Sequence, residues 1–431
     1  MERFIIEGKH PLRGVITPSG NKNSALPLLS ACLLTDEPIV LHNIPQIRDV
    51  LTMRSLIQSL GVEIESIDNH TWKVQAKDIK VADLDPDLCR QIRASILLAG
   101  PVIARAGELH LPPPGGDVIG RRRVDTHILA LNSLGAKAEY DRSNKVFHFR
   151  AKALSGNDIL LDEASVTATE NAIMAAVTAK GTTQIRNAAS EPHVQELCYF
   201  LNTLGAQIEN IGSNTLTITG VKKLHGGEFT IGSDYLEVVS FIGAAVITHG
   251  SISIQNAGPK YLDMISIVFH RLGVTWEVIG ENIVVPENQE LAIQPDLGDA
   301  IPEICVMPWP AFPTDLMSIA IVIATQSKGS ILFHDWMYPS RMFFLDKLVN
   351  MGAQIVLCDP HRCIVQGPTM LYGERMESPD IRAGMTLVLA ALAAEGQSII
   401  RNVGQIDRGY EKVDEKLRSL GAQIERVQEN N

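Results

Sequence analysis

The sequence predicts an α/β fold of two domains, each made of three repeats with helices buried inside and sheets outside. Its 431 residues are too many for one hydrophobic core, which favours two domains. A phrase of the type Leu-Gly-Val or Leu-Gly-Ala, beginning with Met in one copy, recurs about every 70 residues. Its glycines are Gly61, Gly135, Gly205, Gly273, Gly352 and Gly421.

Each repeat predicts the same order of elements. An amphipathic helix precedes the glycine, and in the first copy Val50, Met53 and Ile57 fall on one helix face. The glycine supplies the left-handed residue that commonly ends a helix, and an alternating strand follows, as at residues 422–427. Earlier in each repeat lies a uniformly apolar helix, such as residues 172–179, which we expect to be buried. The repeat is therefore a β-α-β-α-β-β unit.

Composition excludes several classes of protein. The chain is 45% hydrophobic and 20% charged, so it is not a disordered tail. Its formal net charge of −11 argues against general nucleic-acid binding, and local basic clusters indicate a small anionic ligand instead. Apolar runs such as residues 319–324 are too short to cross a membrane, and the N-terminus lacks the pattern of a signal peptide. We expect a soluble, cytoplasmic protein.

The six cysteines show no disulfide framework. Only Cys358, His361 and Cys363 have a spacing that resembles a metal site. They lie between two strand-like runs, residues 354–357 and 364–366, so a hairpin turn is the favoured interpretation. The sequence predicts no metal and no cofactor.

Cations recur at one position of the repeat. The residue 13 positions before the glycine is basic in four copies, and the fifth repeat has Arg341 at 11 positions before. We expect these residues at the start of the second helix, where a cation opposes the helix dipole. Solvated arginines explain any single case, but repetition favours an anionic ligand shared by several helix ends. The four residues are Arg48, Arg122, Lys260 and Arg408.

Charged residues also stand near the start of the buried helices. This group comprises Lys22, Arg93, Asp315 and Arg382. Such residues are seldom buried without partners, so they indicate a second functional position. For Asp315 alone, a plain helix N-cap stays open as an alternative.

The second repeat departs from the others. A marker residue lies 17 to 19 positions before the phrase glycine in five repeats, whereas Pro112 lies 23 positions before Gly135. The markers are Asn43, Asn187, Asn256, Asp335 and Asn402. The insertion carries Gly115, Gly116 and Asp117 beside three arginines at residues 121–123. Prolines restrict the backbone of this loop, glycines make it flexible, and an aspartate lies beside the arginines. A loop with these properties is a candidate for function.

These residues resemble the enolpyruvyl transferases, in particular those that act on UDP-N-acetylglucosamine. The resemblance covers essentially the whole chain. It is carried by motifs at residues 19–23, 93–95, 114–122, 125–127, 165–171, 312–315, 380–383 and 406–410. It implies two inside-out α/β domains: residues 21–230, with the catalytic loop 112–123, and residues 1–20 plus 231–431. The N-terminal strand is expected to join the second domain, and the active site to lie in the cleft between the domains.

The resemblance also implies a reaction and its substrates. Phosphoenolpyruvate would donate its enolpyruvyl group to the 3′-hydroxyl of UDP-N-acetylglucosamine and release phosphate, the first committed step of peptidoglycan synthesis. Neither a nucleic acid nor a membrane is implied as a partner. Phosphoenolpyruvate carries a phosphate and a carboxylate, so several cations must surround it. By resemblance its ligands are Lys22, Asn23, Arg122, Arg341, Arg382 and Arg408.

The resemblance assigns the nucleotide sugar to a further set of residues. Asp315 is implied as the base that takes the proton of the sugar hydroxyl, with Lys22 and Asp117 as the other catalytic residues. The remaining contacts with the nucleotide sugar are Arg93, Arg122, Arg123, Val124, Asp125, Thr126, Ser165, Val166 and Met337.

The chain departs from the family pattern in two places. Asp117 occupies the loop position at which many members have cysteine. Either side chain can protonate the enol carbon, but a carboxylate is ordinarily ionised at neutral pH, so bound substrate and closure of the loop must favour its protonated form. Aspartate also lacks the thiolate that fosfomycin alkylates, which predicts resistance. Trp309 and the pair Met317 and Ser318 depart near Asp315 and leave another nucleotide-linked acceptor open.

Three alternative functions can be compared with this one from the residues. A 3-phosphoshikimate 1-carboxyvinyltransferase would have different residues around Lys22 and Arg93. A DNA sliding clamp needs a positive inner surface, which these apolar helices do not offer. An inactive paralogue that binds a nucleotide sugar stays open.

Overall fold

The computed structural model describes the chain except residues 1, 82, 118–119, 121–122 and 429–431. The chain divides into two compact units. The N-terminal unit comprises Gly20–Asp117 and Arg122–Gly232, and the C-terminal unit comprises Met1–Ser19, Val118–Arg121 and Ser233–Asn431. Each unit has its own cluster of buried hydrophobic residues, so each is described by itself.

In the N-terminal unit, the described residues form three sheets around a set of buried helices. The strand orders of the sheets are β13(Gly227–Thr230)-β3(Ile39–His42)-β5(Trp72–Gln75)-β4(Glu63–Ser66), β6(Glu108–Leu111)-β8(Val146–Arg150)-β7(Lys137–Asp141) and β11(Gln207–Glu209)-β12(Thr215–Thr219)-β10(Thr182–Arg186)-β9(Asp158–Leu160). The helices are α1(Lys22–Ala31), η1(Cys32–Leu34), α2(Arg48–Ser59), α3(Pro86–Gln91), η2(Arg93–Leu98), α4(Ala99–Ala106), α5(Asp125–Ser133), α6(Val166–Ala176) and α7(Pro192–Thr203).

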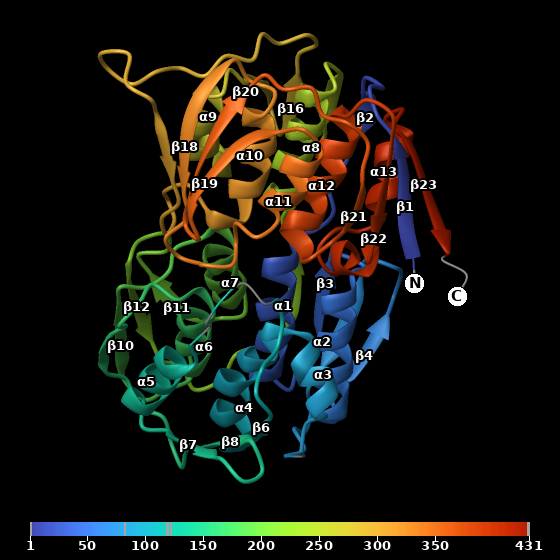
Figure 1. The fold of residues 1–431 in the computed structure, drawn as a ribbon. Helices are drawn as coiled ribbons and strands as arrows, with labels where there is room; N and C mark the ends of the chain where they lie inside the picture. The colour runs from blue at the N-terminus through green and yellow to red at the C-terminus, as the bar shows by residue number, and fades with distance from the viewer. Residues whose placement is uncertain (1, 82, 118–119, 121–122, 429–431) are drawn as a thin grey trace. The chain divides into compact units, whose positions relative to one another are not determined.

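The C-terminal unit repeats this plan with its own described residues (Figure 1). The strand orders of its sheets are β15(Glu277–Ile279)-β16(Asn282–Val285)-β14(Ser251–Ile254)-β2(Arg13–Ile16), β17(Glu303–Cys305)-β18(Gly329–His334)-β20(Arg362–Gly367)-β19(Gln354–Asp359) and β21(Arg375–Glu377)-β22(Gln397–Arg401)-β1(Glu2–Glu7)-β23(Gln423–Gln428). The helices are α8(Tyr235–Ile247), η3(Pro259–Tyr261), α9(Asp263–His270), η4(Thr314–Leu316), α10(Met317–Ala324), α11(Leu345–Asn350), α12(Ile381–Ala393), η5(Val403–Arg408) and α13(Val413–Ser419).

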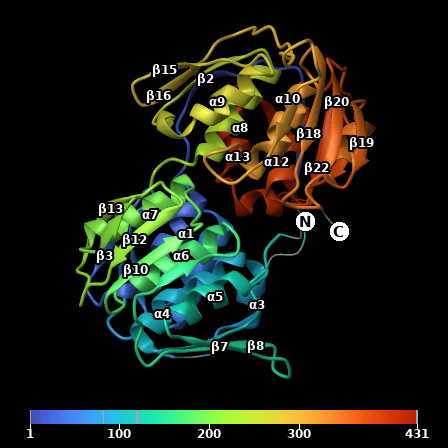
Figure 2. The same ribbon diagram turned by 90° about the vertical axis from the view of Figure 1, so that its left-hand side faces the viewer.

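The core of the C-terminal unit is made by helices α8, α10 and α12, which contact one another pairwise. Every residue of these three helices is buried, which explains their largely apolar sequences. Figure 2 shows them between strands of the surrounding sheets. The predicted fold class, with helices inside and sheets outside, is confirmed.

The N-terminal strand joins the last repeat of the chain. Strand β1 pairs antiparallel with both β22 and β23, as the family resemblance implied. In Figure 1 it lies beside the strands from the other end of the chain. The first residues therefore complete a sheet of the C-terminal unit.

The phrase glycines end helices as predicted. All six have positive φ, between 83° and 105°, and each follows the second helix of its repeat. The markers Asn43, Asn187, Asn256 and Asn402 also have positive φ, which asparagine tolerates better than most residues. Pro112 in repeat two is absent from this group because its ring fixes a negative φ.

The helix-start position of the repeated cations needs a correction. Arg48 is the first residue of α2, as predicted. Lys260 and Arg408 instead lie in the 3₁₀ turns η3 and η5, and Arg341 lies in a turn before α11. The prediction failed because an extra turn precedes these helices, so their cations lie in that turn, a few residues before the helix begins. Arg122 lies outside the described residues.

The segment around Cys358 and Cys363 lies outside the site. Residues 354–359 and 362–367 pair as the hairpin β19–β20, so the hairpin interpretation of Cys358 to Cys363 is confirmed. Among the described residues, no helix has both the length and the apolar character needed to cross a membrane.

Candidate active site

Helix α1 of the N-terminal unit begins with a buried ion pair. Asn21 caps the helix by accepting hydrogen bonds from the amides of Asn23 and Ser24 at 2.8 and 3.3 Å. Lys22 follows the cap, and its Nζ lies 2.7 Å from Oδ2 of Asp49 on α2. The two side chains are only 9% and 7% exposed, so the pair holds a cation at a helix N-terminus that would otherwise repel it.

Asp49 is a residue that the sequence interpretation missed. It follows Arg48, the residue that the repeat comparison singled out, and it is buried on the inner face of α2. A carboxylate in the first turn of a helix is commonplace, so its type gave no signal. The signal was its position beside a predicted buried lysine that required a partner.

The Gly-Gly-Asp loop packs closely on the last turn of α3 and on Arg93 at the start of η2. The amides of Gly115 and Gly116 donate to the carbonyl oxygens of Cys89 and Arg90 at 3.1 and 3.3 Å. A Cβ on Gly115 would lie 1.7 Å from the oxygen of Arg90, so this approach requires glycine. Gly116 has a φ of 99°, which also favours glycine. The two glycines thereby anchor half-buried Asp117 close to the predicted ligand Arg93.

The predicted nucleotide-sugar ligands of the N-terminal unit form a linked set. Nη2 of Arg93 donates to the carbonyl oxygen of Arg123 at 2.5 Å. Arg123 contacts Asp125 at 3.2 Å and Asp162 at 2.8 Å, and Thr126 donates to Asp162 at 2.7 Å. Asp162, which the sequence interpretation did not single out, is the common acceptor. The hydrogen bond from the hydroxyl of Thr126 is the main influence that lowers the pKa of Asp162, and the side chain of Arg123 lowers it further.

His127 joins two of the family motifs, residues 125–127 and 165–171, inside the N-terminal unit. Asn171 accepts from the amide of Gly100 with Oδ1 at 2.7 Å, so its Nδ2 donates to Nδ1 of His127 at 2.9 Å. The proton of the imidazole is then on Nε2, which donates to Thr167 at 3.1 Å. Burial, and secondarily the charge of Arg93, lowers the pKa of His127 to about 3. His127 is therefore a neutral positioning residue beneath the predicted ligands.

Ser165 and Val166 mark the start of another buried helix. Ser165 is the N-cap residue of α6, and its carbonyl oxygen accepts from the amide and hydroxyl of Thr169 at 2.9 and 2.8 Å. Val166 is the first helical residue and is half-buried. Val124 immediately precedes α5 in the same way. These residues thus present backbone at helix N-termini, which suits negatively charged groups.

In the C-terminal unit, Asp315 lies between two buried arginines. Oδ1 of Asp315 is 2.5 Å from Nη2 of Arg341, and Oδ2 is 3.3 Å from Nη2 of Arg382. The arginine side chains are 5% and 7% exposed, whereas that of Asp315 is 29% exposed. Burial opposes the charge of both guanidiniums, but Asp315 is the chief opposing influence and the net effect raises the pKa of each. Both guanidiniums therefore stay charged.

Neighbouring side chains fix the two segments that carry this cluster. Asp335 accepts from the hydroxyl of Thr314 at 2.5 Å and from the amides of Met337 and Tyr338 at 3.0 and 3.2 Å. It thereby links the turn of Asp315 to the turn that leads to Arg341. Burial raises the pKa of Asp335, although these hydrogen bonds oppose the shift.

Helix α12 brings Arg382 into the cluster. Asp380 caps the helix by accepting from the amides of Arg382 and Ala383 at 2.8 and 3.0 Å. Nη1 of Arg382 reaches the hydroxyl of Tyr410 at 3.4 Å, and this hydroxyl is 2.9 Å from that of Ser240. Arg408 lies two residues before Tyr410 and donates to Gln405 at 3.0 Å.

One polar atom of the cluster has no partner in the part of the chain that the structure describes. Nε of Arg341 is buried and makes no hydrogen bond there. An orphaned guanidinium donor beside a carboxylate and a second arginine is costly unless an anion receives it. Nε of Arg341 is therefore a buried donor that no described group of the C-terminal unit receives.

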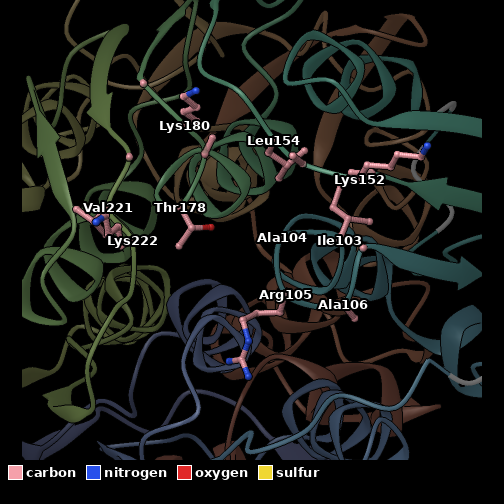
Figure 3. Close-up of a pocket in the computed structure, with 16 residues that line it drawn as sticks. Ile103, Ala104, Arg105, Ala106, Lys152, Leu154, Thr178, Lys180, Val221 and Lys222 are labelled. Atoms are coloured by element: carbon pink, nitrogen blue, oxygen red, sulfur yellow. The ribbon is translucent and has the colours of Figure 1, made fainter.

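A separate hollow of about 660 Å³ lies in the N-terminal unit, and it contains none of the predicted site residues (Figure 3). It is lined by the C-terminal end of α4 and by the segments 151–154, 178–181 and 220–222, which carry Lys152, Lys180 and Lys222. Arg105 donates to the carbonyl oxygens of Leu33 and Ala76 at 3.1 and 3.2 Å. Among the predicted ligands, Ser165 and Val166 lie at the N-terminal end of α6, and the segment that follows the other end of this helix lines the hollow.

Comparison with known proteins now decides the family. The model of EPSP synthase (3-phosphoshikimate 1-carboxyvinyltransferase) matches residues 6–417. The chain belongs to the enolpyruvyl transferase family. A UDP-N-acetylglucosamine 1-carboxyvinyltransferase of Treponema denticola is 54% identical over 425 residues, covering 99% of each chain. One of Bradyrhizobium diazoefficiens is 56% identical over 427 residues, covering 99% of this chain and 98% of the relative.

Solved structures show the same fold at low identity. The enolpyruvyl transferase NikO from Streptomyces tendae has a TM-score of 0.87 at 24% identity, over 100% of this chain and 99% of its own. An EPSP synthase from Acinetobacter baumannii has a TM-score of 0.77 at 17% identity, over 99% of this chain and 100% of its own. This chain therefore shares its fold with enolpyruvyl transferases of low sequence identity. Its sequence is more than half identical to the two UDP-N-acetylglucosamine 1-carboxyvinyltransferases.

Proposed function

We propose that the enzyme transfers the enolpyruvyl group of phosphoenolpyruvate to the 3′-hydroxyl of UDP-N-acetylglucosamine and releases phosphate. The observation that carries this proposal is the identity of 54% and 56%, over nearly the whole chain, to relatives that bear this name. A 3-phosphoshikimate acceptor has less support, because the solved EPSP synthase shares only 17% identity. The product would enter peptidoglycan synthesis and so serve cell-wall growth and division.

The charges of both units suit phosphoenolpyruvate. Its phosphate and carboxylate need several cations, and we assign Lys22, Arg341, Arg382 and Arg408 to them, with Asn23 as a polar neighbour. The free Nε of Arg341 supports the assignment because it supplies a buried donor. Arg122, the remaining predicted ligand, lies outside the described residues.

The reaction is an addition followed by an elimination. The 3′-oxygen forms a bond to C2 of phosphoenolpyruvate as its proton leaves to Asp315, and the C3 methylene gains a proton. The C2–O bond to phosphate then breaks, a proton leaves C3, and the double bond forms again. Atoms balance: the sugar hydroxyl loses hydrogen, and the phosphate leaves with the oxygen that it brought. Asp315 is 29% exposed and held by two guanidiniums, so it is oriented and accessible to the hydroxyl.

We assign protonation of C3 to Asp117. The loop of Asp117 is anchored by Gly115 and Gly116, which contact the residues just before Arg93. Arg93 is one of the predicted ligands of the nucleotide sugar. The proposal requires Asp117 to hold a proton when both substrates are bound. The double negative charge of the phosphate and exclusion of water favour that form.

Phosphate release tests the reaction and its acceptor. Purified full-length enzyme with phosphoenolpyruvate and UDP-N-acetylglucosamine should release phosphate, whereas 3-phosphoshikimate in place of the nucleotide sugar should not support release. Release only with a different nucleotide-linked acceptor would point to Trp309 and Met317 as changes of specificity. Thermal stabilisation by UDP-N-acetylglucosamine without any release would favour an inactive paralogue and contradict the proposal.

Two variants test Asp117. Asp117→Ala should lose turnover by about 10²–10⁴-fold, the usual contribution of a general acid. Asp117→Cys should keep turnover and become sensitive to fosfomycin, whereas the natural chain should resist it. A cysteine variant that is active but still resistant would show that Asp117 does not occupy the acid position.

A further inference from the structure

Three side chains on the sheet β17-β18-β20-β19 converge from two neighbouring strands. Cys305 and His334 are register partners in the parallel ladder β17–β18, and Glu303 lies two residues before Cys305. Side chains alternate along a strand, so all three lie on the same face, while Ile304 and Phe333 are buried on the other. The convergence follows from the register and does not depend on a flexible loop.

The distances between their ligand atoms fit a tetrahedral metal. One atom from each residue lies within 4.8 Å of the other two. Sγ of Cys305 is 3.9 Å from Nδ1 of His334, which is 3.2 Å from Oε1 of Glu303. Zinc bonds of about 2.3 Å to sulfur and about 2.0–2.1 Å to nitrogen or oxygen require about 3.6 and 3.4 Å at tetrahedral angles. Both distances are within about 0.3 Å of these values.

We propose that Glu303, Cys305 and His334 bind one Zn²⁺ ion, with water as the fourth ligand. Thiolate, imidazole and carboxylate together suit zinc, whereas Mg²⁺ and Ca²⁺ prefer oxygen alone. Three protein ligands plus water is the open form of zinc coordination. This site does not include Cys358, His361 or Cys363, the residues whose spacing resembles a metal site. Cys358 and Cys363 lie on the two strands of the β19–β20 hairpin, and His361 lies between the strands.

Neighbouring charges do not oppose the ion. Arg362 faces His334 across the β18–β20 ladder, but Asp359 holds its guanidinium at 2.6 Å. Arg271 donates to the backbone oxygen of Glu303 and is paired with Asp296 at 2.5 Å. Each nearby cation therefore has a carboxylate of its own, and the side chain of Glu303 stays available to a metal.

A bound ion would join the strands that lead to Asp315 and to Met337. The amide of Val306 donates to the oxygen of His334 at 3.1 Å, and Trp336 donates to the oxygen of Val306 at 2.7 Å. Strand β17 is only three residues long, so a crosslink at Cys305 would hold its end. Zn²⁺ should therefore raise the midpoint of thermal unfolding as well as bind.

Binding of Zn²⁺ to the chelator-treated full-length protein tests the proposal by calorimetry. We expect one ion per chain, not displaced by millimolar Mg²⁺, and a sulfur-to-metal charge-transfer absorption when Co²⁺ replaces Zn²⁺. Cys305→Ser and His334→Gln should each weaken binding by at least about 10-fold, since even outer-shell changes cost that much.

Cys358→Ser is the matched control, because Cys358 is an exposed cysteine of the same sheet outside the proposed set. It should bind Zn²⁺ as the natural chain does. Unchanged binding by the double variant Cys305→Ser/His334→Gln would overturn the proposal, as would a Co²⁺ complex without thiolate absorption. Since the readout is binding, failure of this test leaves the transferase proposal untouched.

Discussion

The two units place charge at the start of a buried helix in opposite senses. In the N-terminal unit the cation Lys22 begins α1 and is held by the carboxylate of Asp49. In the C-terminal unit the carboxylate of Asp315 precedes α10 and is held by Arg341 and Arg382. Equivalent positions of the repeated fold thus hold a cation at the start of α1 and an anion before α10. The repeat supplies the position, and the partner residues supply the role.

The largest expected effect breaks the C-terminal arrangement. Asp315→Asn keeps the shape of the side chain but removes the proposed base, so kcat should fall by about 10²–10⁴-fold. Phosphate release measures kcat, and thermal unfolding checks the fold. Asp296→Asn is the matched control, since Asp296 also pairs with an arginine, Arg271, at 2.5 Å but lies outside the proposed site. If Asp315→Asn kept its kcat and lost only stability, Asp315 would be a structural partner of the arginines.

The buried pair of the N-terminal unit separates stability from function. Lys22→Met should cost about 3–5 kcal/mol of the free energy of unfolding, because it leaves a buried carboxylate without its cation at 2.7 Å. The double variant Lys22→Met/Asp49→Leu should recover most of that loss while phosphate release stays absent.

Denaturant unfolding of the four members of this cycle gives the coupling. Lys223→Met is the control: its pairs with Asp36 and Glu37 are exposed to solvent, so their loss should have little effect on stability. A double variant that regained turnover would contradict the role of Lys22 as a ligand.

The pH dependence of stability tests His127. Its pKa is lowered to about 3 in the fold, while an unfolded histidine has its ordinary value of about 6.5. As pH falls through this window, the unfolded chain binds a proton that the folded chain excludes. Stability should therefore fall by up to about 1.4 kcal/mol per pH unit, and the contribution is fully present above pH 6.5.

His127→Gln should remove this part of the slope, whereas exposed His270→Gln should not. The difference between the natural chain and each variant, followed by denaturant unfolding from pH 7 to pH 4, isolates the effect. An unchanged slope in His127→Gln would show that another group excludes the proton.

The smallest expected effect on stability concerns Arg123, which is 38% exposed. Arg123→Gln should leave the free energy of unfolding nearly unchanged, because its ion pairs are at the surface. The KM for UDP-N-acetylglucosamine should nevertheless rise severalfold at unchanged kcat, since the residue is proposed to bind this substrate. A fall in kcat at unchanged KM would assign Arg123 to the chemical step.

The sequence carried much of the fold because its signals were local and repeated. The six glycines that end helices, the buried apolar helices and the inserted loop at Pro112 were all visible as patterns. Lys22, Arg93, Asp315 and Arg382 were also correctly placed near helix starts, since a charged residue before an apolar helix stands out.

What the sequence did not reveal were partners brought together by tertiary structure. Asp49 pairs with Lys22 across two helices, and Asp162 joins Arg123 to Thr126 across 36 or more positions of the chain. Likewise, Cys305 and His334 meet only through strand register. Single acidic or basic residues are common on any surface, so neither spacing nor composition distinguishes these from the rest.

The mass of the nucleotide sugar after reaction tests the central claim most directly. Purified enzyme, phosphoenolpyruvate and UDP-N-acetylglucosamine should yield a nucleotide sugar heavier by one enolpyruvyl group, in equal amount to the phosphate released. Phosphate without this gain of mass, or an unaltered nucleotide sugar with no phosphate, would contradict the account.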